Sequence, residues 1–167
     1  MFAAPCLAAA TKLLDACKVL GLRLATAESC TGGLIIGCLT EIAGSSAVVD
    51  RGYVVYDNRA KVEMLGVREA TLLDQGAVSE LTAREMAAGA LARSGSGLAV
   101  AVTGIAGPDG GTAEKPVGLV HLAAATHAGV TLHERRVFKG DRRAIRHATI
   151  EAALRLALEA LDGGDVA

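Results

Sequence analysis

The sequence predicts an α/β fold: a three-layer α/β/α sandwich around a mixed sheet, forming a single domain over residues 1–167 with an ordered core at about 5–161. Three observations support this prediction. Helical and strand-like patterns alternate early in the chain, and a hairpin pattern follows late. Half of the chain (51%) is apolar, which is enough for a sizeable core. We find neither a linker nor an internal repeat.

In the first part of the chain, apolar residues at helical spacing indicate an opening helix, which Gly21 ends. Apolar or Val/Tyr-rich segments between turn residues indicate strands. In chain order, the expected elements are a helix over Leu7–Leu20, a strand over Leu22–Ala27, a helix from Leu34 to about Ile42, a strand over Ala47–Tyr56, a short helix containing Lys61 and another over Glu69–Leu73.

In the second part, helix-capping residues mark two longer helices, with Ser79 before Glu80–Arg93 and Asp141 before Arg142–Leu161. The remaining expected elements are a buried-type strand over Gly97–Thr103, a long loop over Gly104–Pro116 and a hairpin of Val117–Thr126 and Val130–Phe138 that turns at His127-Ala128-Gly129. We expect the tail Asp162–Ala167 to be frayed.

Composition excludes several classes of protein. The net charge of −1 argues against a broad basic face for duplex DNA, and the low aromatic content (2%) argues against a stacking platform for single strands. No stretch resembles a membrane span or a signal peptide. We therefore expect a cytoplasmic protein without nucleic-acid or membrane partners. Its four cysteines, which form no C-x-x-C pair, are expected to be buried thiols: Cys6, Cys17, Cys30 and Cys38.

The first candidate site segment is a turn between a strand and a helix, and it contains Ser29, Cys30, Thr31, Gly32 and Gly33. A hydroxyl here lies beside the free N–H groups of the helix start, and the glycines allow close approach to the backbone. The turn suits either a nucleophile with an adjacent oxyanion site or a phosphate cradle. On spacing alone a plain helix N-cap is the favoured interpretation, because Ser and Thr are common there, and it does not exclude the other two. For the preceding Glu28, the simplest role is to orient the turn.

The second candidate segment contains Tyr56 and Lys61. A lysine acts as a general base only when neutral, and at an ordinary pKa of about 10.4 roughly one in a thousand is neutral near pH 7.5. Lowering that pKa by about 3 units costs about 4 kcal/mol, which burial, a nearby cation or a hydrogen-bond donor such as Tyr56 must supply. The alternative is a solvated surface lysine beside a packing tyrosine.

The third candidate segment begins at Thr103 and Gly104 and continues through Gly107 into a glycine-rich loop. It leaves the carboxyl end of a strand, which is the usual ligand-binding edge of an α/β sheet. Its spacing matches neither the dinucleotide-binding fingerprint nor a P-loop. A glycine-rich loop of this length in a compact domain is more often functional than idle, although a mobile surface connection remains the alternative.

Two weaker groups of side chains complete the candidates. The last expected helix begins with Arg142, Arg143 and Arg146. Because the start of a helix disfavours positive charge, arginines there are better explained by a bound anion such as phosphate than by a solvent-exposed polar face. Both interpretations remain open. The histidines show no metal-ligand spacing, so we expect them to be structural or exposed and predict no metal site: His121, His127, His133 and His147.

Taken together, the motifs and their order resemble the CinA C-terminal domain family over about Leu7–Leu161. The resemblance implies a nicotinamide-nucleotide amidase that converts nicotinamide mononucleotide to nicotinate mononucleotide and ammonia without a cofactor. The matching motifs are Ala27-Glu28-Ser29-Cys30-Thr31-Gly32-Gly33, Gly52-Tyr53 with Tyr56 through Lys61, Gly76-Ala77-Val78-Ser79, Val102-Thr103-Gly104-Ile105-Ala106-Gly107-Pro108-Asp109-Gly110-Gly111 and Lys115-Pro116-Val117-Gly118.

The resemblance implies a Ser/Lys-type amidohydrolase in which Ser29 is the nucleophile, Lys61 its base, Tyr56 the partner of Lys61, and Thr103 an orienting hydroxyl. We expect Cys30 and the N–H groups around Thr31–Gly33 to border the oxyanion. Gly104, Gly107 and Arg142 are expected to hold ribose and phosphate.

Many members of the family carry an additional N-terminal nucleotide-processing domain, for which this chain has no room, so we expect no pyrophosphatase activity. Two other functions stay open: a non-catalytic nucleotide-binding module of competence or DNA-damage responses, and an amidase for another carboxamide. Alanine-rich helices suggest a possible homodimer.

Overall fold

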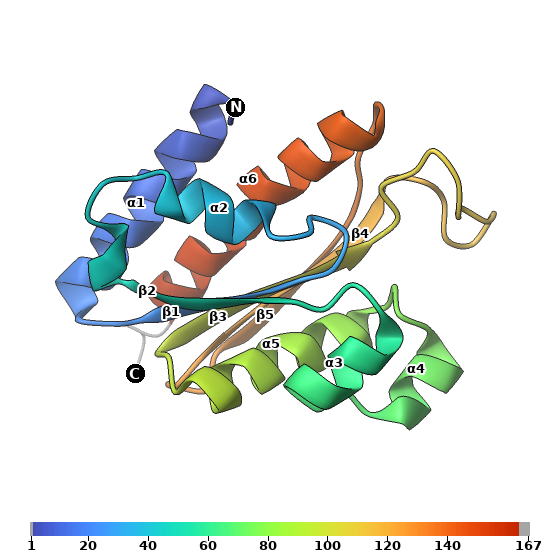
Figure 1. Cartoon of the computed structure of the whole chain (residues 1–167), viewed down its shortest axis with the longest axis horizontal. Helices are drawn as coiled ribbons and strands as arrows, with labels where there is room; N and C mark the ends of the chain where they lie inside the picture. Colours follow the sequence, from blue (N-terminus) through green and yellow to red (C-terminus); the bar gives the residue numbers. More distant parts are fainter. Residues whose placement is uncertain (1, 164–167) are drawn as a thin grey trace.

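The computed structural model describes residues 2–163 and has three layers, with one mixed sheet between two layers of helices (Figure 1). One helical layer contains α1 (Ala4–Leu20), α2 (Leu34–Thr40) and α6 (Arg142–Asp162); the other contains α3 (Asn58–Leu65), α4 (Glu69–Gln75) and α5 (Glu80–Ser94). The strands are β1 (Leu24–Glu28), β2 (Val49–Val54), β3 (Leu98–Gly104), β4 (Leu119–Thr126) and β5 (Thr131–Val137). The predicted fold class is thereby confirmed.

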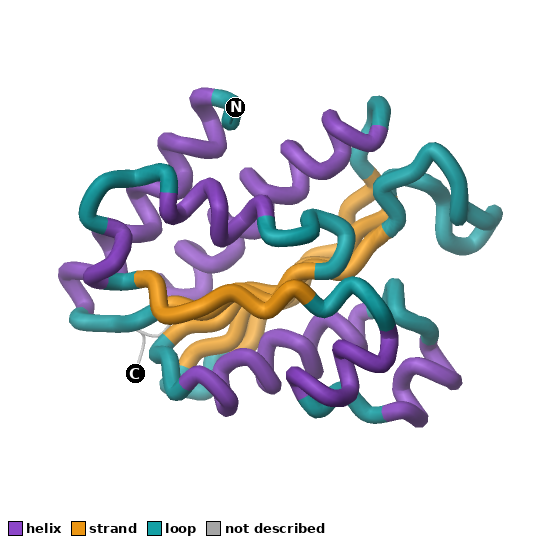
Figure 2. The backbone as a smooth tube through the Cα atoms, in the orientation of Figure 1, coloured by secondary structure: helices purple, strands orange, loops and turns teal. Residues whose placement is uncertain are grey.

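The strand order places the carboxyl ends of three strands at one edge. Across the described residues the order is β2-β1-β3-β4-β5; β1 runs parallel to β2 and β3, β4 pairs antiparallel with β3, and β5 pairs antiparallel with β4. The chain leaves β1, β2 and β3 at the same edge, from which the long loop after β3 projects (Figure 2). Residues that follow these strands are thereby brought together.

The two faces of the sheet carry side chains of different size. In β3, Leu98, Val100 and Val102 belong to the core under α1, α2 and α6, whereas Ala99 and Ala101 belong to the core under α5. Successive strand residues point to opposite faces, so this alternation separates a bulky core from a small-residue core. Short alanine side chains on the second face let α5 pack close to the sheet.

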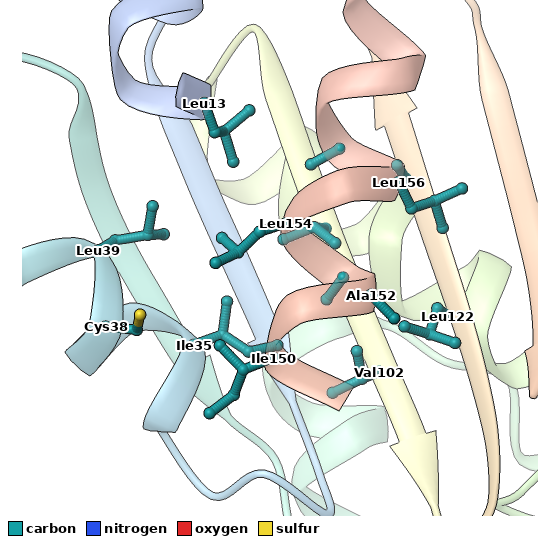
Figure 3. Close-up of a cluster of buried hydrophobic side chains, with 14 of the residues drawn as sticks. Leu13, Ile35, Cys38, Leu39, Val102, Leu122, Ile150, Ala152, Leu154 and Leu156 are labelled. Carbon is teal, nitrogen blue, oxygen red and sulfur yellow. The ribbon is translucent and has the colours of Figure 1, made fainter. Parts of the chain in front are cut away.

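The bulky core joins three helices to the sheet. Leu13 of α1, Ile35 of α2, Val102 of β3, Leu122 of β4 and Leu154 of α6 all lie in one buried cluster (Figure 3). Burying a side chain of this size stabilises the fold by about 1.5–3 kcal/mol. All four cysteines are buried and unbridged, as expected for core thiols.

Some element boundaries differ from those predicted. The Leu22 amide still bonds the Cys17 carbonyl of α1, so the strand begins at Leu24 rather than Leu22 and extends to Glu28. The predicted strand over Ala47–Tyr56 is shorter, because a 3₁₀ turn (Ser45–Ala47) precedes β2. The expected frayed tail lies outside the described residues from 164 onward, and Asp162 still belongs to α6.

Within residues 2–163, no helix combines the length and the apolar character needed to cross a bilayer.

Gly89 provides a test of the close packing of α5. A Cβ atom at this position would overlap the backbone carbonyl of Leu65 in α3, which cannot move aside as a side chain can. We expect Gly89→Ala to lower the free energy of unfolding by about 2 kcal/mol, although alanine is the better helix former. Denaturant unfolding measures this change.

The matched control is Gly37→Ala in α2, where the nearest atom to an added Cβ is a Phe2 side-chain atom at 3.6 Å. This substitution should leave stability unchanged or raise it by up to about 1 kcal/mol. Equal effects at both positions would contradict the packing of α5 against α3.

Candidate active site

A buried carboxylate organises the turn after β1. Glu28, the last residue of β1, has no exposed surface, and its two carboxylate oxygens accept five hydrogen bonds. The donors are Thr26 Oγ1 (3.2 Å), Thr31 Oγ1 (2.7 Å), Gly33 N (3.0 Å), Ile35 N (3.0 Å) and Ile36 N (2.8 Å). Glu28 therefore caps the start of α2 and fixes the conformation of the turn that follows it.

The amides of Gly32 and Gly33 are occupied, so this part of the predicted oxyanion site needs correction. Gly33 N donates to Glu28, and Gly32 N donates to the Ser29 carbonyl at 3.1 Å. Both glycines have positive φ (60° and 92°), which the turn requires. Within the described residues, the neighbouring N–H groups of Cys30 and Thr31 make no hydrogen bond to the protein; because Thr31 has no exposed surface, the Cys30 N–H group is the candidate that remains.

A pocket of about 220 Å³ lies where the carboxyl ends of β1, β2 and β3 meet. Seven of the predicted site residues line it: Ser29, Cys30, Tyr56, Lys61, Thr103, Gly104 and Arg142. Thr31, Gly32, Gly33 and Gly107 are not among its lining residues. The pocket also takes in four residues that we did not single out, Asn58, Ala77, Val78 and Ala106, whose only signal in the sequence is their place within the motifs.

Lys61 is buried, with 1% of its surface exposed, so the surface-lysine interpretation is wrong. It lies in α3, which Asp57 caps by accepting a hydrogen bond from Arg59 N at 2.8 Å. The Lys61 amine donates to the carbonyls of Val55 (3.0 Å) and Tyr56 (3.1 Å). Burial lowers the pKa of Lys61, and the Asp57 carboxylate partly opposes this. The neutral amine is thereby favoured relative to a lysine in water.

Tyr56 contacts Lys61 through its backbone carbonyl, which differs from the predicted phenol donor. Its ring is exposed (61%), and its hydroxyl accepts a hydrogen bond from Arg142 Nη2 at 3.3 Å. Arg142 Nη1 also donates to the Gly107 carbonyl at 2.9 Å. Gly107 therefore supports the pocket wall through Arg142, and the Tyr56 side chain borders the pocket mouth.

Cys30 and Thr103 flank the serine in different ways. The Cys30 thiol is buried, and burial raises its pKa to about 12, which leaves it protonated near neutral pH. Of the two residues Cys30 and Ser29, Ser29 is therefore the better nucleophile candidate. It lies in the same pocket as Lys61, whose amine has a lowered pKa. Thr103 is also buried, and its hydroxyl donates to the Ala77 carbonyl at 2.7 Å, joining β3 to the segment before α5.

Two histidines form a pair away from this pocket's lining. His121 Nδ1 and His133 Nε2 are 3.0 Å apart, and their rings are stacked. Burial and the neighbouring His133 lower the pKa of His121 to about 4. The pair links β4 to β5, in agreement with a structural role.

The fold and the site define a three-layer α/β domain in which a serine hydroxyl and a buried lysine amine share one pocket. Comparison with protein families gives one match that covers most of the chain: the family model of the CinA C-terminal domain matches residues 7–161. The chain belongs to this family.

Among curated proteins, the chain is 51% identical over 140 residues to "Nicotinamide-nucleotide amidohydrolase PncC" of Escherichia coli (strain K12), covering 84% of this chain and 85% of that protein. It is 52% identical to a "CinA-like protein" of Chloroherpeton thalassium, covering 87% of this chain but 35% of that longer protein. Among solved structures, the competence/damage inducible protein CihA from Agrobacterium tumefaciens superposes with a TM-score of 0.94 at 56% identity, covering 97% of this chain and 98% of that one.

Glu28→Gln tests whether the buried carboxylate stabilises the turn. A glutamine of the same size replaces one acceptor oxygen by an NH₂ group that faces backbone donors. We expect the free energy of unfolding to fall by about 3 kcal/mol, measured by denaturant titration. The exposed Glu41, at the other end of α2, is the matched control, and Glu41→Gln should change stability by less than about 0.5 kcal/mol. Indistinguishable effects of the two substitutions would refute the capping role.

Proposed function

We propose that this protein hydrolyses nicotinamide mononucleotide to nicotinate mononucleotide and ammonia. One observation carries the proposal: Lys61 is buried with a lowered pKa in the same pocket as Ser29. The substrate class comes from the relatives named nicotinamide-nucleotide amidohydrolase, to which the chain is 51–52% identical over most of its length. By this relationship the chain is an enzyme, a hydrolase that acts on an amide.

The first half of the proposed reaction transfers an acyl group to the serine. Neutral Lys61 takes the proton of the Ser29 hydroxyl, and Ser29 Oγ attacks the carboxamide carbon of the nicotinamide ring. When the tetrahedral intermediate collapses, the carbon–nitrogen bond breaks and the departing amine takes a proton from Lys61, leaving as ammonia. Water then hydrolyses the acyl-enzyme ester, with Lys61 again acting as the base.

The contacts of Lys61 suit this role. A neutral amine has two N–H groups and one lone pair, and the carbonyls of Val55 and Tyr56 accept two hydrogen bonds from it. With both N–H groups engaged, the lone pair is the position left to accept a proton. The two carbonyls thereby fix the orientation of the amine, whereas the amine of a flexible lysine in water has no fixed orientation.

The developing oxyanion needs donors that the protein does not already use. The N–H group of Cys30, which lines the pocket, meets this requirement, whereas Thr31 has no exposed surface and the N–H groups of Gly32 and Gly33 bond Ser29 and Glu28. We therefore assign the oxyanion site to the first amide after Ser29. Thr103, anchored on Ala77, would orient the proton transfer from the opposite wall, and Tyr56 and Arg142 would border the ribose at the mouth.

We place the reaction in the cytoplasm. The four described cysteines are buried free thiols, and free thiols persist where glutathione and thioredoxin keep the compartment reducing.

Two substitutions test the mechanism. Ser29→Ala removes the nucleophile and Lys61→Ala removes the base, so each should lower kcat for ammonia release from nicotinamide mononucleotide by about a thousandfold or more. Lys12→Ala, at an exposed position of α1 on the other helical layer, is the control and should retain full activity. Equal rates in all variants would end the assignment, and tight nucleotide binding without turnover by the wild type would favour a binding module.

The pH dependence tests the protonation state of Lys61. The base works only when neutral, so kcat/KM should rise with pH along a limb whose midpoint lies below the ordinary pKa of lysine. The Asp57 carboxylate raises the pKa of Lys61, so Asp57→Asn, which keeps a helix cap but removes the charge, should move this limb to lower pH. A limb that Asp57→Asn leaves in place or moves upward would contradict Lys61 as the base.

A further inference from the structure

We propose that Lys115 is a positioning residue for the proposed reaction, because it ties the glycine-rich loop to the wall of the reaction pocket that anchors Thr103. Its Nζ donates to the carbonyl of Gln75 at 2.6 Å, and the loop and α4 lie at the same end of the molecule (Figure 1). Lys115 does not line the pocket, so it acts through the segment that it holds. The inference rests on the proposed function, since it concerns how Thr103 is oriented in that reaction.

The wall segment runs from Gln75, the last residue of α4, to Val78, which precedes the cap of α5. Two of its residues, Ala77 and Val78, line the reaction pocket. The segment continues no helix or strand after Gln75, so its carbonyls need other partners. Side chains from three different parts of the fold supply them. The carbonyls and their donors are Gln75 with Lys115 (2.6 Å), Gly76 with Ser79 (3.1 Å) and Thr82 (2.9 Å), and Ala77 with Thr103 (2.7 Å).

Gly76 lets the lysine approach the backbone closely. Its φ of 79° and ψ of 167° define a conformation that is essentially confined to glycine. A Cβ atom at this position would lie 3.1 Å from Lys115 Nζ. The amine therefore lies close to the backbone at the point where the chain leaves α4 and becomes the pocket wall.

The backbone of Lys115 is itself held in place within the loop. Lys115 N donates to Thr112 Oγ1 at 3.0 Å, and Thr112 N donates to the Lys115 carbonyl at 2.8 Å. The base of the loop is closed by two further bonds, from Ile105 N to the Leu119 carbonyl (2.8 Å) and from Gly118 N to the Ile105 carbonyl (2.8 Å). The hydrogen bond from Lys115 therefore joins the wall segment to a part of the loop that is fixed to the sheet.

Electrostatics favours a cation at this position. The last carbonyls of a helix have no partner inside it, and the carboxyl-terminal end carries partial negative charge. An ammonium group that donates to such a carbonyl forms a charge-assisted hydrogen bond. Methionine in place of Lys115 would keep an apolar chain of similar length and remove this interaction.

The effect of Lys115 reaches the reaction through Thr103. Ala77 follows Gln75 by two residues, and its carbonyl is the acceptor of the Thr103 hydroxyl. If the wall segment shifts, this hydroxyl loses its fixed acceptor and with it its orientation in the pocket. A displacement of about 1 Å outside the reacting atoms can cost about a hundredfold in rate. Substrate binding should change less, because Lys115 and Gln75 lie outside the pocket lining.

The first experiment measures kcat and KM for ammonia release from nicotinamide mononucleotide. It compares the wild type with Lys115→Met, Lys115→Arg and the control Lys12→Met, which changes an exposed lysine of α1. We expect Lys115→Met to lower kcat by about tenfold or more and to change KM by less than about threefold. Lys115→Arg keeps a charged donor and should retain at least about a third of the wild-type kcat, and Lys12→Met should retain all of it. Equal kcat in all four proteins, equal losses in both Lys115 variants, or a change confined to KM would overturn the proposal.

A double-mutant cycle tests whether Lys115 acts through Thr103. Thr103→Val removes the hydroxyl and keeps the branched shape of the side chain. In this background Lys115→Met should lower kcat by less than about twofold, because the hydroxyl that it orients is already absent. The full loss in the Thr103→Val background would contradict the route through Thr103.

Hydrogen exchange at the Gly76 amide, followed by NMR, separates this inference from the proposed function because it needs no substrate. Gly76 N donates to the Leu72 carbonyl at 3.1 Å, at the end of α4. We expect Lys115→Met, but not Lys12→Met, to speed this exchange by about fivefold or more. Unchanged exchange in Lys115→Met would overturn the proposal. A wild type that releases no ammonia would refute the proposed function, and the exchange comparison would then decide by itself whether Lys115 holds the wall.

Discussion

The buried carboxylate of Glu28 constrains the rest of the site. A charge without access to water is tolerated only when hydrogen bonds replace its hydration, and here five donors surround it. Three of those donors are amides at the start of α2, so the carboxylate determines where that helix begins. Thr31 supplies a fourth donor, which fixes the turn between them. The position of Ser29 in the pocket is a consequence of this arrangement.

The lysine depends on the same architecture from the other side of the sheet. Glu28 shares its face with Thr26, to which it is hydrogen-bonded, and lies under α2, whereas Lys61 comes from the helical layer of α5. That layer packs on alanines such as Ala99 and Ala101, whose short side chains allow the close approach that keeps water away. Exclusion of water lowers the pKa of Lys61, while backbone carbonyls hold its amine. The tight packing of this layer and the lowered pKa of Lys61 therefore have one origin in this domain.

The protein itself satisfies the donors at the start of α2. Glu28 neutralises the positive end of this helix, and in the turn before it the Cys30 N–H group makes no hydrogen bond to a described residue. In the same helical layer, the N-terminal turns of α6 contact α2 and carry arginines, which is unfavourable for the helix alone. The N-terminal ends of α2 and α6 thus have different charge environments. The protein neutralises the first with Glu28 and leaves the second electropositive.

Local pattern determined much of this protein. Helical spacing, strand composition and capping residues such as Ser79 and Asp141 predicted nearly every element, and the motifs indicated Ser29, Lys61 and Thr103 as one group. Boundaries shifted by a few residues where a local hydrogen bond at the end of a helix or a 3₁₀ turn replaced strand pairing. Only the tertiary structure decided that Lys61 is buried, that Tyr56 contacts it through a carbonyl, and that the glycine amides are occupied by Glu28 and Ser29. The reason is physical: a sequence records which groups a segment carries, whereas burial and hydrogen-bond partners arise from segments far apart in the chain.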